Sequence, residues 1–310
     1  MAVHEIPLER RTLHGHFSRD LEPVLTIDSG DTIAFSCLNA GWRALSGEHF
    51  EHRAPEGDER DAGHALVGPV GVLGARAGQT LAIRIDEIRI GPWGFSQGGG
   101  WHTPLNERLG LHEGEGATLD WTLDADAGLG VDQGGREVAL RPFLGVVGMP
   151  PAAPGLHSTA PPRPCGGNID CRELVAGTTL YLPIAVDGAL LSAGDGHAAQ
   201  GDGEVGQLAI EAPVERAVLT VSVRDDLPLR NPIAWTPQAW LTFGFDEDLH
   251  EAMVVALDGM LELMGREHGL ARADALALAS VVVDLRVTQV VNGAQGVHAV
   301  LAHDAIRFTS

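Results

Sequence analysis

The stretch Leu66–Ile90, "LVGPVGVLGARAGQTLAIRIDEIRI", indicates the kind of fold that this chain adopts. Apolar and polar residues alternate within it, and "RAGQ" (residues 76–79) is a turn signal. A second stretch, "PVLTIDSGDTIAFSCL" (residues 23–38), alternates in the same way around "DSGD". Alternation with a period of two is typical of strands with one buried face. The first 150 residues are therefore predicted to form many short strands.

Further strands are predicted at residues 178–186, 206–214 and 216–224, and the pattern changes after about residue 245. Apolar residues then recur at steps of 4, 4, 3 and 4, at Leu249, Met253, Leu257, Met260 and Met264. This spacing predicts one face of a helix, with Asp246 as its N-cap and Gly269 just past its end. A second helix and two strands follow. We expect a β-rich body at residues 1–240 that carries an α+β unit at residues 241–310.

One long segment interrupts the predicted strands of the body. Residues 46–64, "SGEHFEHRAPEGDERDAGH", are charged and punctuated by Gly and Pro. Loops of this length in compact domains are often lids or the walls of a site. We therefore regard residues 46–64 as a candidate wall of a binding pocket.

The charge of the chain excludes several classes of partner. It has 310 residues with 42 acidic and 21 basic side chains, and its net charge is −21. Such a surface repels nucleic acid and anionic lipid, and no apolar run approaches the roughly 18 residues of a membrane span. Every basic residue is Arg, which excludes a P-loop and hydrolases that need a catalytic lysine. Residues 1–11 contain no apolar run of a secretory signal, so a cytoplasmic protein is expected.

The stretch Ala193–Gly206, "AGDGHAAQGDGEVG", is the richest in chemistry. Strand alternation would place Asp195 and His197 on one face. Carboxylate, imidazole and amide oxygens together suit a zinc or calcium ion. The spacing does not match an EF-hand. A glycine-rich hairpin with solvated turn residues explains the same pattern about as well.

Two other stretches are weaker candidates for a site. In "CGGNIDCRE" (residues 165–173), Asn168, Asp170 and Glu173 follow a Gly-Gly pair that lets the backbone approach a ligand. In "GPWGFSQGGGWHTPLN" (residues 91–106), Trp93 and Trp101 flank glycines and could form a pocket wall. Taken alone, the first is also typical of an ordinary loop and the second of simple packing.

Covalent catalysis and cofactor binding find little support. No G-x-G-x-x-G motif follows a predicted strand and opens a helix, so no dinucleotide-binding site is expected. The three cysteines, Cys37, Cys165 and Cys171, are odd in number and lack CxxC spacing, which argues against disulfides and a thiolate zinc site. A nucleophilic Cys171 paired with His157 has no supporting context.

Residues 140–215, which contain "GGNID" and "GDGHAAQGDGE" in this order, resemble the acetamidase/formamidase family. The resemblance extends to residues 23–35, 63–83, 248–253 and 284–300, and so to nearly the whole chain. It implies hydrolysis of a short amide such as formamide or acetamide, by a jelly-roll-like β-sandwich body with a smaller α+β part. Members are similar in carrying a metal ion near these acidic motifs. That implies a divalent metal, zinc or calcium, at Asp170, Asp195, His197 and Glu204, with Gln200 and Asp202 as neighbours.

The resulting hypothesis is hydrolysis by a metal-activated water, with Glu204, Asp170 and His197 as the catalytic residues. Glu204 or Asp170 would take the proton of the water and pass it to the leaving nitrogen. One alternative is a hydrolase of another small amide or carbamate that uses a side-chain nucleophile such as Cys171. Another is a non-catalytic β-sandwich that binds ligands through Trp93 and Trp101. A homo-oligomer is expected from the apolar body and helix pair.

Overall fold

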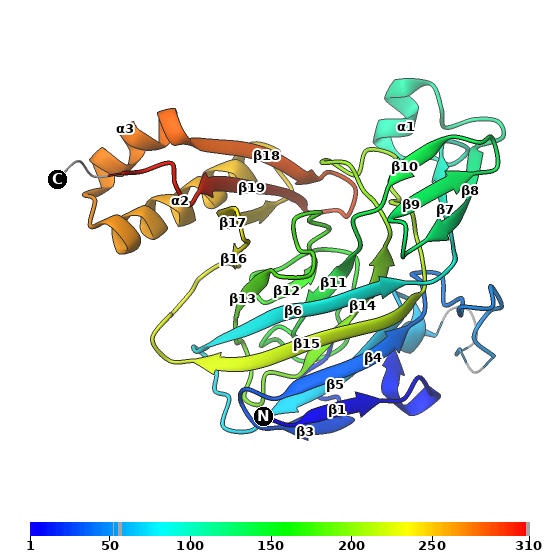
Figure 1. Cartoon of the computed structure of the whole chain (residues 1–310), viewed down its shortest axis with the longest axis horizontal. Coiled ribbons are helices and arrows are strands. Elements are labelled where there is room, and N and C mark those ends of the chain that lie inside the picture. The colour runs from blue at the N-terminus through cyan, green and yellow to red at the C-terminus, as the bar shows by residue number, and fades with distance from the viewer. Residues whose placement is uncertain (52, 55–57, 308–310) are drawn as a thin grey trace.

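The computed structural model describes residues 1–51, 53–54 and 58–307, and three β-sheets dominate this part of the chain (Figure 1). The longest is a nine-stranded sheet, whose strands in spatial order are β1 (Val3–Ile6), β4 (Thr32–Cys37), β15 (Val214–Arg224), β6 (Thr80–Ile90), β13 (Thr179–Pro183), β16 (Ile233–Trp235), β17 (Ala239–Asp246), β19 (Gln295–Ala302) and β18 (Val283–Gln289). Neighbouring strands are antiparallel except for β1 and β4, which are parallel.

A second sheet of six strands faces the first. It contains β12 (Gly166–Asn168), β11 (Phe143–Gly148), β14 (Leu191–His197), β5 (Leu66–Val72) and β2 (Leu13–His14), with β3 (Leu25–Ile27) paired to β5. A separate four-stranded sheet contains β10 (Glu137–Ala139), β9 (Leu129–Asp132), β8 (Ala117–Asp124) and β7 (Trp93–Gly98). Helix α1 (Pro104–Leu109) follows β7, and two 3-10 turns, η1 (Arg10–Thr12) and η2 (Glu59–Asp61), complete the body.

The stretch Leu66–Ile90 forms β5 and β6, which lie in opposite sheets. Every residue of β5 is buried, whereas β6 exposes Arg84, Asp86 and Glu87 on one face. Gly74 and Gly78 adopt positive φ angles in the connection, where a residue with a Cβ would be strained. The chain therefore crosses from one layer of the sandwich to the other at this turn.

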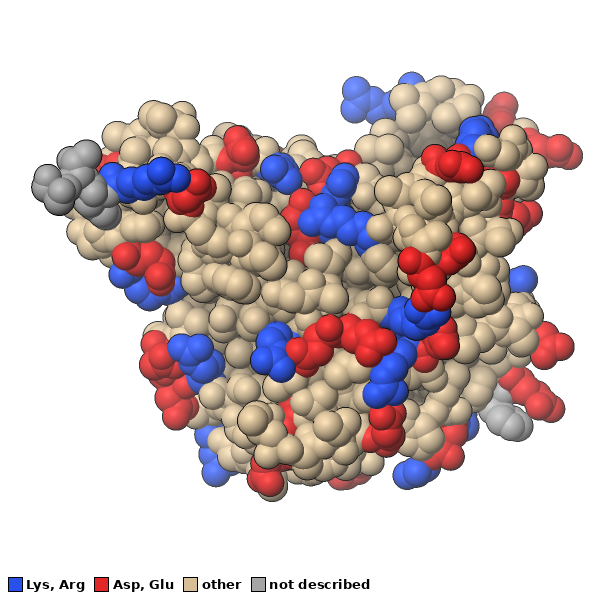
Figure 2. All heavy atoms as spheres, in the orientation of Figure 1, with Lys and Arg blue, Asp and Glu red and all other residues tan. Residues whose placement is uncertain are grey.

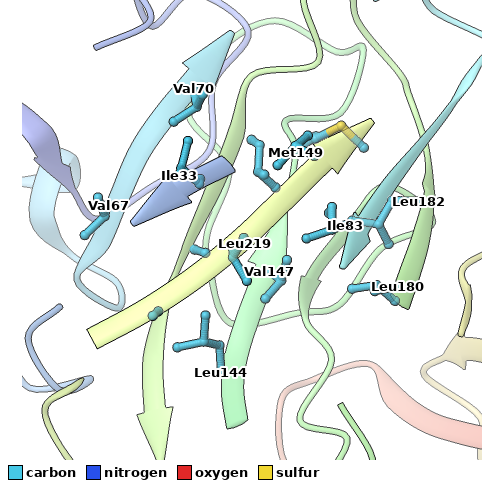
Figure 3. Close-up of a cluster of buried hydrophobic side chains, with 14 of the residues drawn as sticks. Ile33, Val67, Val70, Ile83, Leu144, Val147, Met149, Leu180, Leu182 and Leu219 are labelled. Atoms are coloured by element: carbon cyan, nitrogen blue, oxygen red, sulfur yellow. The ribbon is translucent and has the colours of Figure 1, made fainter. Parts of the chain in front are cut away.

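The core fills the space between the two large sheets (Figure 3). Side chains of the nine-stranded sheet, such as Ile83 and Leu219, meet side chains of the six-stranded sheet, such as Val67, Val70 and Val147. All five are at most 3% exposed. At about 25 cal/mol per Å² of apolar surface removed from water, this layer is the main source of stability of the body. The predicted mainly β sandwich is confirmed.

The C-terminal unit consists of α2 (Leu249–His268), α3 (Arg272–Val282) and strands β17 to β19. Met260 and Met264 of the predicted helical face are buried against β19, and the other predicted positions are partly buried there. Gly269 ends α2 with a left-handed φ of 68°, as predicted. The predicted N-cap is wrong: Asp248 caps the helix, because its carboxylate accepts from the His250 N–H. Asp246 instead ends β17 and accepts from the Asp248 N–H.

The nine-stranded sheet continues from the body into the C-terminal unit. Strand β17 spans residue 240 and pairs with β16 on one side and with β19 on the other. The two parts keep separate apolar clusters, one between the large sheets and one between α2, α3 and β19. The division at residues 240 and 241 stays a prediction, but the shared sheet fixes the C-terminal unit beside the body.

The charged residues are interspersed on the face that Figure 2 shows. Arg89, for example, forms ion pairs with Asp126 and Glu215, and Arg216 forms ion pairs with Glu5 and Glu87. Exposed pairs of this kind contribute at most about 1 kcal/mol each. Within the described part of the chain, no helix combines the length and the apolar character needed to span a membrane.

Candidate active site

Five buried side chains form one group at the end of the six-stranded sheet, which we call the acid–histidine cluster: Asp170, Asp195, His197, Glu204 and Glu211. Ligand atoms of Asp170, Asp195 and His197 lie within 4.8 Å of one another, and so do those of His197, Glu204 and Glu211. The structure thus brings together all four residues that the sequence predicted as metal ligands. Glu211 is an addition.

His197 is the centre of the cluster. Its Nε2 atom lies 3.4 Å from Asp195 Oδ2 and 3.4 Å from Glu211 Oε1. Its Nδ1 atom lies 2.9 Å from Gln200 Oε1, and the Gln200 amide donates to the Asp170 carbonyl at 2.7 Å. That donation fixes the orientation of the Gln200 amide group, so its oxygen faces His197 Nδ1 and this nitrogen carries a proton. In the neutral ring, the Nε2 lone pair then faces two carboxylates.

The carboxylates are not satisfied by protein donors. Among the described residues, one oxygen of each acid has no hydrogen-bond partner: Asp170 Oδ1, Asp195 Oδ1, Glu204 Oε2 and Glu211 Oε2. Buried carboxylate oxygens without partners are energetically unfavourable, and the Nε2 lone pair of His197 faces two of the same carboxylates. Imidazole nitrogen and carboxylate oxygens are ligands that divalent metals accept. The donor set therefore fits a bound cation.

Electrostatic crowding has large effects on the pKa values of the cluster. Burial raises the pKa of Glu204 to about 7 and that of Glu211 to about 8, and the Asp195 charge adds to both shifts. Burial, followed by the Glu204 charge, also raises the pKa of Asp170 well above its usual range. Burial alone would lower the pKa of His197, but Glu211 and Asp195 outweigh it and raise that pKa well above its ordinary value. The cluster therefore retains protons at neutral pH unless a cation replaces them.

The backbone is strained where it presents these acids. Asp170, Asp195 and Glu204 have φ angles of 50°, 63° and 47°, in the left-handed region that residues with a Cβ rarely adopt. Such strain persists only where the surrounding structure holds it, and it is concentrated at functional sites. Three of the five members of the cluster are held in this way.

The glycines near the cluster allow close approach of neighbouring groups. A Cβ on Gly145 of β11 would lie 2.4 Å from Asp195 Oδ2, 2.6 Å from Asp170 Oδ1 and 2.9 Å from His197 Cε1. Gly194 and Gly196 lie within strand β14, where a Cβ would meet the carbonyl oxygens of neighbouring chain segments. Glycine thus serves a turn at Gly203, which has a φ of 95°, whereas within β14 it allows close approach of neighbouring segments.

The C-terminal unit contributes to the cluster. Asn292, in the turn between β18 and β19, donates from Nδ2 to Asp170 Oδ2 at 2.6 Å. The loop that carries Glu204 is attached to the end of β18, because the Gly203 N–H donates to the Thr288 carbonyl. Residues more than 80 positions away in sequence thus position two of the predicted ligands.

Two cavities lie beside the cluster. The larger has a volume of about 660 Å³ and is lined by Glu211, Phe95, Leu208 and His64, among others. The smaller has a volume of about 320 Å³ and is lined by Glu204 and Asp202. Five described residues of the predicted wall at residues 46–64 line the larger cavity: Arg53, Glu59, Ala62, Gly63 and His64. Residues 52 and 55–57 of that segment lie outside the described part of the chain.

Sequence reasoning missed Glu211, Asn292 and His64. Glu211 carried a usable signal, because a single acid inside the apolar run "LAIEAPV" is expected to be exposed or functional. Asn292 and His64 carried no such signal, since each acts through a contact distant in sequence. Asp202, in contrast, is exposed and lies outside the cluster.

The alternative nucleophile and the aromatic binding face gain no support. Cys171 is fully buried, and its pKa is raised well above the usual value by burial and by the charge of Glu173, which disfavours a thiolate. Trp93 donates to the Leu45 carbonyl, and Trp101 donates to Gln207. Neither of these two tryptophans is among the described residues that line the cavities, and Trp121 is the tryptophan that lines the smaller one.

Comparisons with known proteins agree with this site. A profile of the Acetamidase/Formamidase family matches residues 149–303, which include the whole acid–histidine cluster. The formamidase of Methylophilus methylotrophus is 26% identical in an alignment of 247 positions that covers 62% of this chain and 59% of the relative. The match therefore spans less than two thirds of that protein.

Solved structures extend the similarity to the whole fold. An acetamidase from Bacillus halodurans has 29% identity and a TM-score of 0.82, over 96% of this chain and 97% of that chain. A predicted acetamidase/formamidase from Thermoanaerobacter tengcongensis has 26% identity and a TM-score of 0.83, over 99% of this chain and 100% of that chain. This chain belongs to the acetamidase/formamidase family and is an amidohydrolase that converts small linear amides to acid and ammonia.

Proposed function

We propose that the acid–histidine cluster binds a divalent metal ion, zinc or calcium, and that the chain hydrolyses a short aliphatic amide, formamide or acetamide, at this site. One observation carries the proposal. The Nε2 atom of His197 lies 3.4 Å from carboxylate oxygens of both Asp195 and Glu211, while its Nδ1 proton is directed to Gln200. Only a proton or a cation between these groups makes the arrangement favourable.

Asp170, Asp195, His197, Glu204 and Glu211 would hold the ion. When bound, a divalent cation polarises an amide carbonyl and lowers the pKa of a water molecule nearby. The central imidazole favours zinc, whereas the surplus of carboxylates suits calcium. Replacing one ion by the other therefore distinguishes the two.

The two glutamates face different cavities, and this suggests a division of roles. Glu211 lines the larger cavity, through which we propose that the amide approaches. Glu204 lines the smaller cavity, which gives it access to water. Asp170 is less suited to move a proton, because Asn292 donates to its Oδ2 atom. Among the predicted catalytic residues, Glu204 is therefore the proposed base, with Asp170 and His197 as ligands.

Glu204 would take a proton from water as the water oxygen forms a bond to the carbonyl carbon. The carbon–nitrogen bond then breaks, and the same proton passes to the leaving nitrogen to give ammonia. Glu204 lines the smaller cavity, so water can reach the carboxylate that would accept and return this proton. Gln200 keeps His197 oriented throughout, through its hydrogen bond to Nδ1.

The test is ammonia release from formamide, acetamide and propionamide, before and after chelation, with metal content measured in parallel. Activity should disappear with the ion and return when zinc or calcium is added. Glu204→Gln, which keeps the shape of the side chain, should lower kcat by about 10²–10⁴-fold. Glu22→Gln is the matched control, since Glu22 is exposed and is not among the residues that line either cavity. Full activity after complete metal removal would refute the proposed role of the ion.

A homo-oligomer and a cytoplasmic location are also part of the proposal. Val281 at the end of α3 is 80% exposed, and Leu285 on the edge strand β18 is 45% exposed. Apolar residues on an unpaired sheet edge favour self-association. Light scattering of the purified protein tests this, and a monomer at micromolar concentration would contradict it. The net charge of −21 supports the expectation that nucleic acid is not a partner.

A further inference from the structure

The volume of the larger cavity is greater than the volume of a short amide. Its volume of about 660 Å³ corresponds to about 20 water molecules at about 30 Å³ each. A molecule of the size of acetamide occupies about 90 Å³ on the same scale. Cavities of about 300–1,000 Å³ are typical of sites that enclose considerably larger ligands. The cavity thus has room for a substrate several times the size of acetamide.

This space opens directly onto the acid–histidine cluster. Glu211 belongs both to the lining of the larger cavity and to the group around His197. Leu208 lines both cavities, so it lies between the amide side and the water side of the proposed site. An amide with its carbonyl group near Glu211 would therefore have its acyl group in the larger cavity.

Apolar side chains supply much of the wall, and several of the polar ones are already engaged. The apolar lining consists of Ala40, Ala62, Phe95, Leu156, Ala160 and Leu208. His64 Nδ1 is hydrogen-bonded to the Thr159 hydroxyl, and His16 Nδ1 to the Arg60 carbonyl. Arg53 donates to the Asp61 carbonyl and lies over the ring of Trp42. What remains for a ligand is mainly apolar surface.

We propose that the preferred substrates are primary amides whose acyl group is larger than acetyl, either an alkyl chain of about five or more carbons or an aromatic ring. The acyl group lies in the larger cavity against Phe95, Leu156 and Leu208. The inference rests on the proposed function, since it assumes that amides react at the acid–histidine cluster. It adds the substrate class, which is determined by the described lining residues 53, 59, 62–64 and 156–160.

The first experiment compares kcat/KM for acetamide, hexanamide and phenylacetamide with the wild-type, metal-loaded protein. Even one methylene group in an apolar pocket changes specificity by about tenfold or more. We therefore expect kcat/KM for hexanamide or phenylacetamide to exceed that for acetamide by at least tenfold. Hydrolysis of acetamide alone would overturn the inference and leave the proposed function intact. Release of ammonia from none of the three, and none from formamide, would refute both.

A variant then locates the effect in the cavity. Ala160 lines the cavity and is partly exposed, so Ala160→Phe adds a ring at the wall without entering the core. It should lower the ratio of kcat/KM for hexanamide to that for acetamide by about tenfold. Ala127→Phe, in an exposed turn, is the control for the added ring and should leave the ratio unchanged. An unchanged ratio in Ala160→Phe, with an unchanged melting temperature, would show that the acyl group lies elsewhere.

Discussion

Replacing Gly145 by alanine perturbs the acid–histidine cluster without removing any of its side chains. Gly145 lies in the middle of β11, and its carbonyl accepts hydrogen bonds from the Ile169 and Asp170 N–H groups. Its φ angle lies outside the left-handed region, so alanine can adopt the same backbone. The added methyl group would point into the hollow between Asp170, Asp195 and His197.

The size of the effect follows from the distances. Real Cβ atoms essentially never approach another heavy atom more closely than 3.0 Å, whereas this one would lie 2.4 Å from Asp195 Oδ2 and 2.6 Å from Asp170 Oδ1. The two oxygens must therefore retreat by at least about 0.6 and 0.4 Å. Metal–ligand distances vary by only about 0.2 Å around their ideal values. Because two ligands are displaced beyond this tolerance, we expect metal affinity to fall by about 100-fold or more.

Isothermal titration of the metal-free protein with zinc and with calcium measures this loss, and circular dichroism verifies the fold. Gly98→Ala is the control, because Gly98 also lies on a strand and a Cβ there would meet no atom within 4 Å. It should bind metal as the wild type does. Wild-type affinity and amidase activity in Gly145→Ala would refute the proposal that the ion occupies this hollow.

Three further predictions concern the support, the protonation and the core of the site. Asn292→Leu removes the donor to Asp170 Oδ2. Because loss of a contact that orients a ligand lowers metal affinity by about 10–100-fold, metal titration should show a decrease of this size. Burial raises the pKa of Glu204 to about 7 and that of Glu211 to about 8, so a cation that binds must displace their protons. The affinity for the cation should therefore rise between pH 6 and pH 8.5. Calorimetry in buffers of different ionisation enthalpy measures the protons released. In the metal-free protein the folded state holds these protons more tightly than the unfolded chain, so stability should fall as pH rises from about 4.5 to about 8, and a flat melting temperature over that range would contradict the assignment. Leu219→Ala, in the fully buried layer between the sheets, should lower the free energy of unfolding by about 2–5 kcal/mol in urea denaturation, and a loss below 1 kcal/mol would show that the cavity collapses.

Local pattern was sufficient for the elements of the fold. Alternation predicted the strands at residues 66–90, and the spacing of Leu249, Met253 and Leu257 predicted the face of α2 that lies against β19. These signals are visible in sequence because a strand or helix must bury one face whatever its partner is. The N-cap was misplaced by two residues, since β17 extends to Asp246 through its pairing with β19. Strand pairing is a long-range contact, and local pattern does not reveal it.

The acid–histidine cluster was likewise predictable only in part from the sequence. Asp195, His197 and Glu204 are near one another in sequence, and the family resemblance added Asp170, so sequence alone identified four of its five members. Glu211, the donor Asn292 and the hollow at Gly145 emerged only from the folded chain, because each depends on strands and turns that meet from distant parts of the sequence. The size of the larger cavity also emerged only from the folded chain, since residues 62–64 and 156–160, which are distant in sequence, both line it. Sequence thus determined the kinds of chemical group present, whereas tertiary contacts decided their distances, their pKa values and the space left for a substrate, because burial and charge act through space rather than along the chain.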